Sequence, residues 1–366
     1  MINTDQLRQG PLSNTGLLQL FKLIHRGQAA DTELAVSVTK NNHSNILEKL
    51  TSAKLAGQFY ALTTDTAVLD AFPREEQETL RGAYERQYQS NRSYLELLEK
   101  LRDRLADEGV DLLLLKGLFL AQRFSGGMDR RFMWDADILV HQHQLRDAIR
   151  VAGDLGLTAT GDTLPVWILN LLNLHALEVS HRGRAIDIHW RLRNRPGYHI
   201  NYERIWNDAQ AIVIDGQPFN ALSDEDALAL SILEIGGDME RGHIKLRSLW
   251  DVYQILQALD GSVNWDEFFE RRKGEGLLQL AVNMLTFFLY CLDCQSECPR
   301  LVESLQQQPT KLLIDNRDVA LQILERPKQH LANRALYARL QPRAVPLYWI
   351  WWLATAPLRF ALTRNL

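Results

Sequence analysis

The chain has 366 residues, enough for two or three structural units, because single cores rarely grow beyond about 250–300 residues. Hydrophobic residues make up 46% and charged residues 23%, which excludes a mostly disordered chain. A net charge of −4 excludes a general attraction to nucleic acid, and we predict no clear nucleic-acid binding, although a local basic patch is compatible with this charge.

The N-terminal residues "MINTDQLRQGPLSNTGLLQL" lack the basic start and apolar stretch of a secretory signal, so we expect a cytoplasmic protein. Three cysteines, Cys291, Cys294 and Cys298, fit a reducing compartment better than a disulfide framework. Their spacing could suggest a metal site, but a closed zinc site normally has four ligands. We therefore expect the cysteines to mark the end of an apolar helix.

Helical periodicity dominates the first part of the chain. Over 44–62 and 74–109, apolar residues recur at three- and four-residue spacing with charges between them. Gly109 closes the second pattern, as a glycine after a helix does. We therefore predict an N-terminal helical region over 1–109.

The pattern changes after Gly109. Short apolar runs follow, of the kind that form buried strands. They are 110–117, 132–140, 175–180 and 184–190. Helices are predicted directly after the first run and over 143–156. The last two runs are separated by a turn that contains glycine, which predicts a β-hairpin, and strand-like patterns end near Trp190.

Helical periodicity returns from about residue 201, and Ser223 fits the N-cap of a helix that begins after it. The predicted fold class is therefore α+β. A small mixed-sheet core over 110–200 is flanked by helical regions over 1–109 and 201–366.

Arg241, His243, Lys245 and Arg247 form a charged stretch that could face a cleft. Such charges more often belong to a solvated helix start, so they stay outside the predicted site.

The C-terminal tail carries Trp349, Trp351 and Trp352 in a stretch without charge between Arg343 and Arg359. A membrane-spanning helix needs about 20 residues, and this stretch is shorter than that. Two alternatives remain open. The tail is a buried segment packed on the helical region, or it makes peripheral contact with a membrane surface.

Asp135 and Asp137 stand inside the second strand-like run, where alternating side chains place both carboxylates on one face. Two such carboxylates repel each other, and a divalent cation with oxygen ligands, Mg²⁺ or Mn²⁺, relieves the repulsion. If the strand with Asp187 is a neighbour, three acids converge, enough to hold two metal ions. The alternative is ion pairing with Arg123, Arg130 or Arg131.

The first strand-like run ends in Lys116 and Gly117, where a helix is predicted to begin. Free backbone N–H groups at such a helix start, together with the lysine charge, can bind a phosphate. The pattern is not a Walker A loop. The alternative is a turn that ends the strand, with a solvated lysine.

The order of "LLLLKG", "RFMWDADILV", "HALEVS" and "AIDIHW" is similar to the uncharacterised nucleotidyltransferase family (family 5) of the DNA polymerase β-like nucleotidyltransferase superfamily. The similarity covers 110–192, and the helical flanks are similar more loosely. It implies that Asp135 and Asp137 bind metal. It also implies that Asp187 completes the site, as the base for an attacking hydroxyl.

The same resemblance places Lys116 and Gly117 where the superfamily has a Gly-Ser nucleotide-binding turn. Leu118 replaces the serine, so a hydroxyl contact to phosphate is missing. Arg131 and His175 match the family pattern and would contact phosphate or acceptor.

The activity implied by the resemblance is transfer of a nucleoside monophosphate from a nucleoside triphosphate to an unidentified hydroxyl acceptor, with Mg²⁺ or Mn²⁺. The alternative is a non-catalytic nucleotide-binding module or scaffold, which the missing serine favours.

Overall fold

The computed structural model describes residues 11–159, 174–181, 183–193 and 197–326, with a few further positions toward the C-terminus. The strands are β1 (Leu113–Leu114), β2 (Asp135–Leu139), β3 (Thr158–Ala159), β4 (Ala176–His181), β5 (Arg184–His189), β6 (Gln210–Ile214) and β7 (Gln217–Ala221). The helices are α2 (Asn14–Arg26), α3 (Ala29–Ser52), α4 (Ala56–Thr63), α5 (Arg74–Asp107), α6 (Leu118–Phe124), α7 (Leu145–Asp154), α9 (Tyr202–Asn207), α10 (Asp224–Arg241), α11 (Leu246–Leu259), α12 (Trp265–Gly274), α13 (Leu278–Leu292), α14 (Pro299–Gln306) and α15 (Arg317–Glu325).

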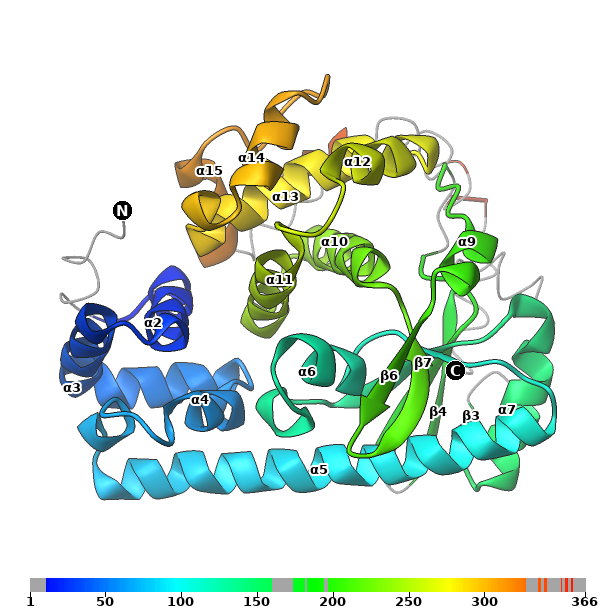
Figure 1. Cartoon of the computed structure of the whole chain (residues 1–366), viewed down its shortest axis with the longest axis horizontal. Coiled ribbons are helices and arrows are strands. Elements are labelled where there is room, and N and C mark those ends of the chain that lie inside the picture. Colours follow the sequence, from blue (N-terminus) through cyan, green and yellow to red (C-terminus); the bar gives the residue numbers. More distant parts are fainter. Residues whose placement is uncertain are drawn as a thin grey trace.

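The strands form one mixed sheet in the order β3-β4-β5-β2-β1-β7-β6 among the described residues. In its middle, β2 pairs in parallel with β5 and antiparallel with β1. Figure 1 shows the N-terminal helices on one side of the molecule, and the long helix α5 runs from them to the sheet. The helices that follow β7 lie above the sheet in the same view. The predicted α+β class is confirmed.

The predicted hairpin is also confirmed, because β4 pairs antiparallel with β5. Gly183 in its turn has a φ of 77°, a conformation that glycine adopts without steric cost. On β5, Ile186 and Ile188 are fully buried, whereas Asp187 between them is only partly buried. This alternation is the one that the sequence predicts, and it directs Asp187 away from the core.

The prediction that strands end near Trp190 is wrong, because the hairpin β6–β7 extends the sheet. β7 pairs in parallel with β1, with Ala221 opposite Leu114. Asp215 and Gly216 have φ values of 47° and 82°, and Asp-Gly is a common sequence for such a two-residue turn. The turn signal is present in the sequence, but the strands beside it are short and partly exposed, so their apolar patterns are brief.

The region expected to be helical from residue 201 therefore contributes two strands to the sheet. The three-region division with boundaries at 109 and 200 stays a prediction. The expected N-cap is present, because Ser223 Oγ accepts a hydrogen bond of 3.1 Å from the Asp226 backbone N–H. The three cysteines are buried free thiols at the end of α13 and just after it.

The tail tryptophans, Trp349, Trp351 and Trp352, lie outside the described residues, so both alternatives for the tail stay predictions. In the part of the chain that the structure describes, no helix has the length and apolar character needed to cross a membrane.

Two side chains of α5 hold the segment that leads into β2. Asn91 is fully buried, and its Nδ2 donates to the carbonyl oxygens of Met128, at 2.5 Å, and Arg131, at 2.7 Å. The Tyr94 hydroxyl donates to the carbonyl oxygen of Trp134 at 2.6 Å. The long helix therefore fixes the backbone immediately before Asp135 in β2.

Replacing Asn91 with alanine is expected to lower the free energy of unfolding by about 2–4 kcal/mol, because two buried carbonyls lose their donor at about 1–3 kcal/mol each. Urea denaturation measures this loss. Gln89→Ala, at an exposed position of the same helix, is the control and is expected to change the free energy by less than about 0.5 kcal/mol. Equal losses of unfolding free energy in the two variants would contradict the conclusion that Asn91 holds the segment before β2.

Candidate active site

The two strands that carry the predicted acids are neighbours. β2 and β5 pair in parallel, with Asp137 directly opposite Asp187. Because paired strands lie about 4.8 Å apart, the two carboxylates approach each other on one face of the sheet. Asp135 is two residues earlier on the same face and lines the same cavity. The structure thus brings Asp137 and Asp187 together and places Asp135 in the wall of the same cavity.

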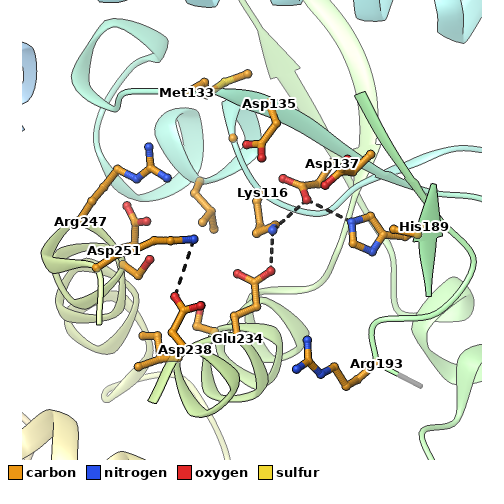
Figure 2. Close-up of a pocket in the computed structure, with 18 of the residues that line it drawn as sticks. Lys116, Met133, Asp135, Asp137, His189, Arg193, Glu234, Asp238, Arg247 and Asp251 are labelled. Atoms are coloured by element: carbon orange, nitrogen blue, oxygen red, sulfur yellow. Dashed lines mark hydrogen bonds and ion pairs between the residues drawn. The ribbon is translucent and has the colours of Figure 1, made fainter. Parts of the chain in front are cut away.

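Lys116 supplies a cation for Asp137. Its ammonium lies 2.8 Å from Asp137 Oδ1 and 2.5 Å from Glu234 Oε1 of α10, as Figure 2 shows. Burial alone would raise the pKa of Asp137, but the Lys116 charge and a hydrogen bond from His189 hold it well below its usual range. Burial likewise lowers the pKa of Lys116, and the two carboxylates more than offset this and raise it.

His189 is absent from the residues that the sequence predicts for the site. Its Nε2 lies 3.1 Å from Asp137 Oδ1, whereas its Nδ1 is buried without a hydrogen-bond partner among the described residues. The ring of His175 lies 5.7 Å from that of His189, centroid to centroid, and lines the cavity. His175 therefore lines the same cavity as the acids, and its contact with substrate stays a prediction.

The pKa of Asp187 reflects its burial and the acids around it. Burial, followed by the negative charges of Asp137 and Asp135, raises the pKa of Asp187 to about 6. Asp137, Asp187 and His189 each offer one ligand atom, and these atoms all lie within 4.8 Å of one another. Carboxylate oxygens suit Mg²⁺ and Mn²⁺, and imidazole is a further ligand for transition metals. The residues present therefore fit a divalent cation.

Gly117 connects β1 to α6 with a φ of 61° and a ψ of −116°, a backbone conformation that only glycine adopts readily. A side chain there would also meet Met133, because a Cβ would lie 3.1 Å from its Sδ. As predicted, the helix begins at the next residue, Leu118. Gly117 lines the cavity with Lys116, and phosphate binding by the pair stays a prediction.

Arg131 lines the cavity, but its guanidinium pairs with an acid of α11. The Nε and Nη2 atoms donate to the two carboxylate oxygens of Asp251 at 2.9 and 3.0 Å. Both residues are almost fully buried. Arg123 pairs with Asp224, and among the described residues no ion pair joins Arg123, Arg130 or Arg131 to the acids of β2. A phosphate contact of Arg131 stays a prediction.

The acids line a cavity of about 430 Å³, within the range of small-ligand sites. Its remaining walls come mainly from α10, α11 and the segment after β5, and their charged residues are missing from the predicted site. They are Arg193, Glu234, Asp238, Arg241, Lys245, Arg247 and Asp251. Figure 2 shows Arg193 and Arg247 on opposite sides of the cavity that the acids line. The charged stretch that was expected to be a solvated helix start thus contributes to the site.

The guanidinium of Arg247 has hydrogen-bond partners for only some of its N–H groups among the described residues. Its Nη1 donates to the carbonyl oxygen of Phe132 at 3.1 Å, but its Nε is buried without a partner among the described residues. Burial and then the positive charge of Arg131 lower the pKa of Arg247. An anion in the cavity would relieve both effects.

The comparison with protein families identifies the family of the chain. The model of an uncharacterised nucleotidyltransferase family matches residues 39–292, more than half of the chain. The chain belongs to this family. The matched range contains every predicted site residue, so the resemblance seen in the strand motifs is confirmed. The comparisons with curated proteins and with solved structures found no match.

Lys116→Met is expected to lower the free energy of unfolding in EDTA by about 3–5 kcal/mol, because it removes the cation from a buried ion pair. Saturating Mn²⁺ is expected to restore a large part of this loss, since a bound cation takes over the neutralisation of Asp137. Denaturation with and without Mn²⁺ measures both effects.

Lys245→Met is the control, because Lys245 is exposed and lies 3.7 Å from an Asp238 oxygen. It is expected to cost less than about 1 kcal/mol in either condition. A loss in Lys116→Met that is the same with and without Mn²⁺ would count against a cation site at Asp137.

Proposed function

We propose that the protein is a metal-dependent nucleotidyltransferase that moves a nucleoside monophosphate from a nucleoside triphosphate to a hydroxyl acceptor. The observation that carries the proposal is the pairing of β2 with β5. It sets Asp137 opposite Asp187 at the wall of a cavity that lysine and arginine side chains also line. Membership of a nucleotidyltransferase family supports the reaction class.

Asp135, Asp137 and Asp187 are the proposed metal ligands. Mg²⁺ or Mn²⁺, when bound, supplies positive charge that neutralises the acids and the substrate phosphates. A carboxylate oxygen of Asp187 accepts the proton of the acceptor hydroxyl. The hydroxyl oxygen then forms a bond to the α-phosphorus, the bond from that phosphorus to the α–β bridging oxygen breaks, and pyrophosphate leaves with the bonding electrons.

The basic residues of the cavity are proposed to bind the triphosphate. Arg247 carries this proposal furthest, because its buried Nε lacks a partner among the described residues and its charge is destabilised beside Arg131. Lys116 is proposed to move from Asp137 to a phosphate oxygen when a metal neutralises the acid, with Gly117 allowing close approach of the backbone. Arg193 faces the cavity from the segment after β5.

Arg131 is proposed to add positive charge to the cavity, and His175 is proposed to contact the acceptor. Arg131 is held by Asp251 and contributes positive charge to the same wall as Arg247. His175 lies beside His189 near the β4–β5 side of the cavity, where it is proposed to contact the acceptor.

A second candidate function is a nucleotide-binding module without turnover. Two observations favour it: Leu118 replaces the serine of the superfamily turn, and Lys116 already neutralises Asp137. Such a module would bind a triphosphate in the same cavity and release it unchanged.

Transfer of label from α-phosphate-radiolabelled triphosphates tests the proposal, with each of the four nucleotides, Mg²⁺ or Mn²⁺, and a cell extract as source of acceptors. The wild-type chain is expected to label an acceptor, and the Asp135→Asn/Asp137→Asn variant is expected to lose about 10³-fold or more of this rate, because it loses the metal ligands.

Asp154→Asn, at the exposed end of α7, is the matched control and is expected to keep wild-type transfer. Transfer by the double variant at the wild-type rate would contradict the proposed site. Metal-dependent nucleotide binding without transfer in any extract would favour the module instead.

A further inference from the structure

A second cavity, of about 440 Å³, lies beside the proposed metal site. It is bounded by the α3–α4 connection, by α5, by the segment before β2 and by the β4–β5 turn. Met133 lines both cavities, and Figure 2 shows it next to Asp135. We call this second cavity the aromatic groove, and its defining residues are Lys54, Arg86, Phe132, Trp134 and Arg184.

Trp134 gives the groove an exposed aromatic surface. It is 64% exposed, and no other large hydrophobic residue exposed in the described part of the chain is aromatic. The ring of Phe132 lies 6.0 Å away, centroid to centroid. An exposed indole immediately before Asp135 is costly to solvate and contributes nothing to the core, so a ligand that stacks on it explains its position.

Three cations line the groove together with the two rings. Lys54 Nζ lies 3.6 Å from the Trp134 ring centroid, and Arg86 and Arg184 line the same groove. Among the described residues, none of the three forms an ion pair with a carboxylate, and no acidic side chain lines the groove. The chain as a whole is negative, at −4, so this local positive charge is complementary to an anion.

The backbone also holds the groove in place. Lys54 has a φ of 58°, a left-handed conformation that favours glycine, yet a lysine stands there with its ammonium over Trp134. The Trp134 carbonyl is held by the Tyr94 hydroxyl, and the Phe132 carbonyl by Arg247. The rings therefore have a fixed position relative to Asp135.

We propose that the aromatic groove binds a nucleoside monophosphate unit of the acceptor. The base stacks on Trp134, and the phosphate pairs with Lys54, Arg86 and Arg184. A neutral sugar would leave the three cations without a counter-charge, which favours a ligand with both a planar ring and a phosphate. Its role as acceptor rests on the proposed function, whereas binding in the groove does not.

The nucleotide unit has two sources, a free nucleotide or the 3′-terminal nucleotide of an RNA. In either case the proposal places a ribose hydroxyl beside Met133, which lines both cavities and lies two residues before Asp135. Proximity of this kind is what converts a bound hydroxyl into an effective nucleophile.

Fluorescence anisotropy of a short 5′-labelled oligoadenylate, titrated with the full chain in EDTA, tests the groove. Trp134→Ala is expected to weaken binding by about tenfold or more, while Trp134→Phe keeps most of the affinity, because stacking needs a ring. Lys54→Ala and Arg184→Ala are each expected to reduce the slope of log affinity against log salt by about 0.7.

The matched control is Arg92→Ala, an exposed cation of α5 outside the groove, which is expected to bind as the wild type does. Competition with unlabelled AMP separates the sources: displacement at similar concentration identifies the free nucleotide unit as sufficient, and displacement only by RNA identifies the strand end. Both results support the groove. Lack of binding by the wild type, or unchanged affinity in Trp134→Ala, would overturn it.

The Asp135→Asn/Asp137→Asn variant makes this test independent of catalysis. It is expected to bind the oligoadenylate in EDTA as well as the wild type does, because the groove does not use these acids. Loss of binding in this variant would place the ligand at the metal site and overturn the proposal. Binding without any label transfer would count against the proposed function alone.

Discussion

The opposition of Asp137 and Asp187 across the β2–β5 pairing is the constraint on which the rest of the site depends. Two partly desolvated carboxylates repel each other, and neighbouring side chains offset part of that repulsion. Lys116 and His189 contact Asp137, while the pKa of Asp187 rises to about 6. A fold that only needed stability would place apolar residues at these positions, so the acids indicate a role for a cation.

Helices on two sides hold the segment that leads into β2 and its acids. From one side, α5 holds the segment before β2 through Asn91 and Tyr94. From the other, α11 holds the same segment through Asp251 and Arg247, which contact Arg131 and Phe132. The segment thus links the N-terminal helices, the acids and the C-terminal helices, and its two faces line the two cavities. The candidate metal site and the aromatic groove therefore depend on the same hydrogen-bonded segment.

The local parts of this picture could be predicted from sequence, and the long-range parts could not. Period-two alternation predicts the face of Asp135, Asp137 and Asp187, and the strand pairing sets Asp137 directly opposite Asp187. Glu234 follows its partner Lys116 by 118 residues, and Arg247 follows its partner Phe132 by 115, and no local pattern on their helices distinguishes a cavity-facing charge from a solvated one. The β6–β7 hairpin was missed despite its Asp-Gly turn, because its strands are too short for a clear pattern.

The central claim is that Asp137 and Asp187 hold a divalent cation against a nucleotide. Anomalous diffraction at the manganese edge tests it most directly, using crystals grown with Mn²⁺ and a triphosphate analogue whose α–β bridge resists cleavage. We expect a manganese peak at coordinating distance from both carboxylates, with the Lys116 ammonium moved from Asp137 to a phosphate. Manganese bound elsewhere on the triphosphate, with Lys116 still paired to Asp137, would contradict it.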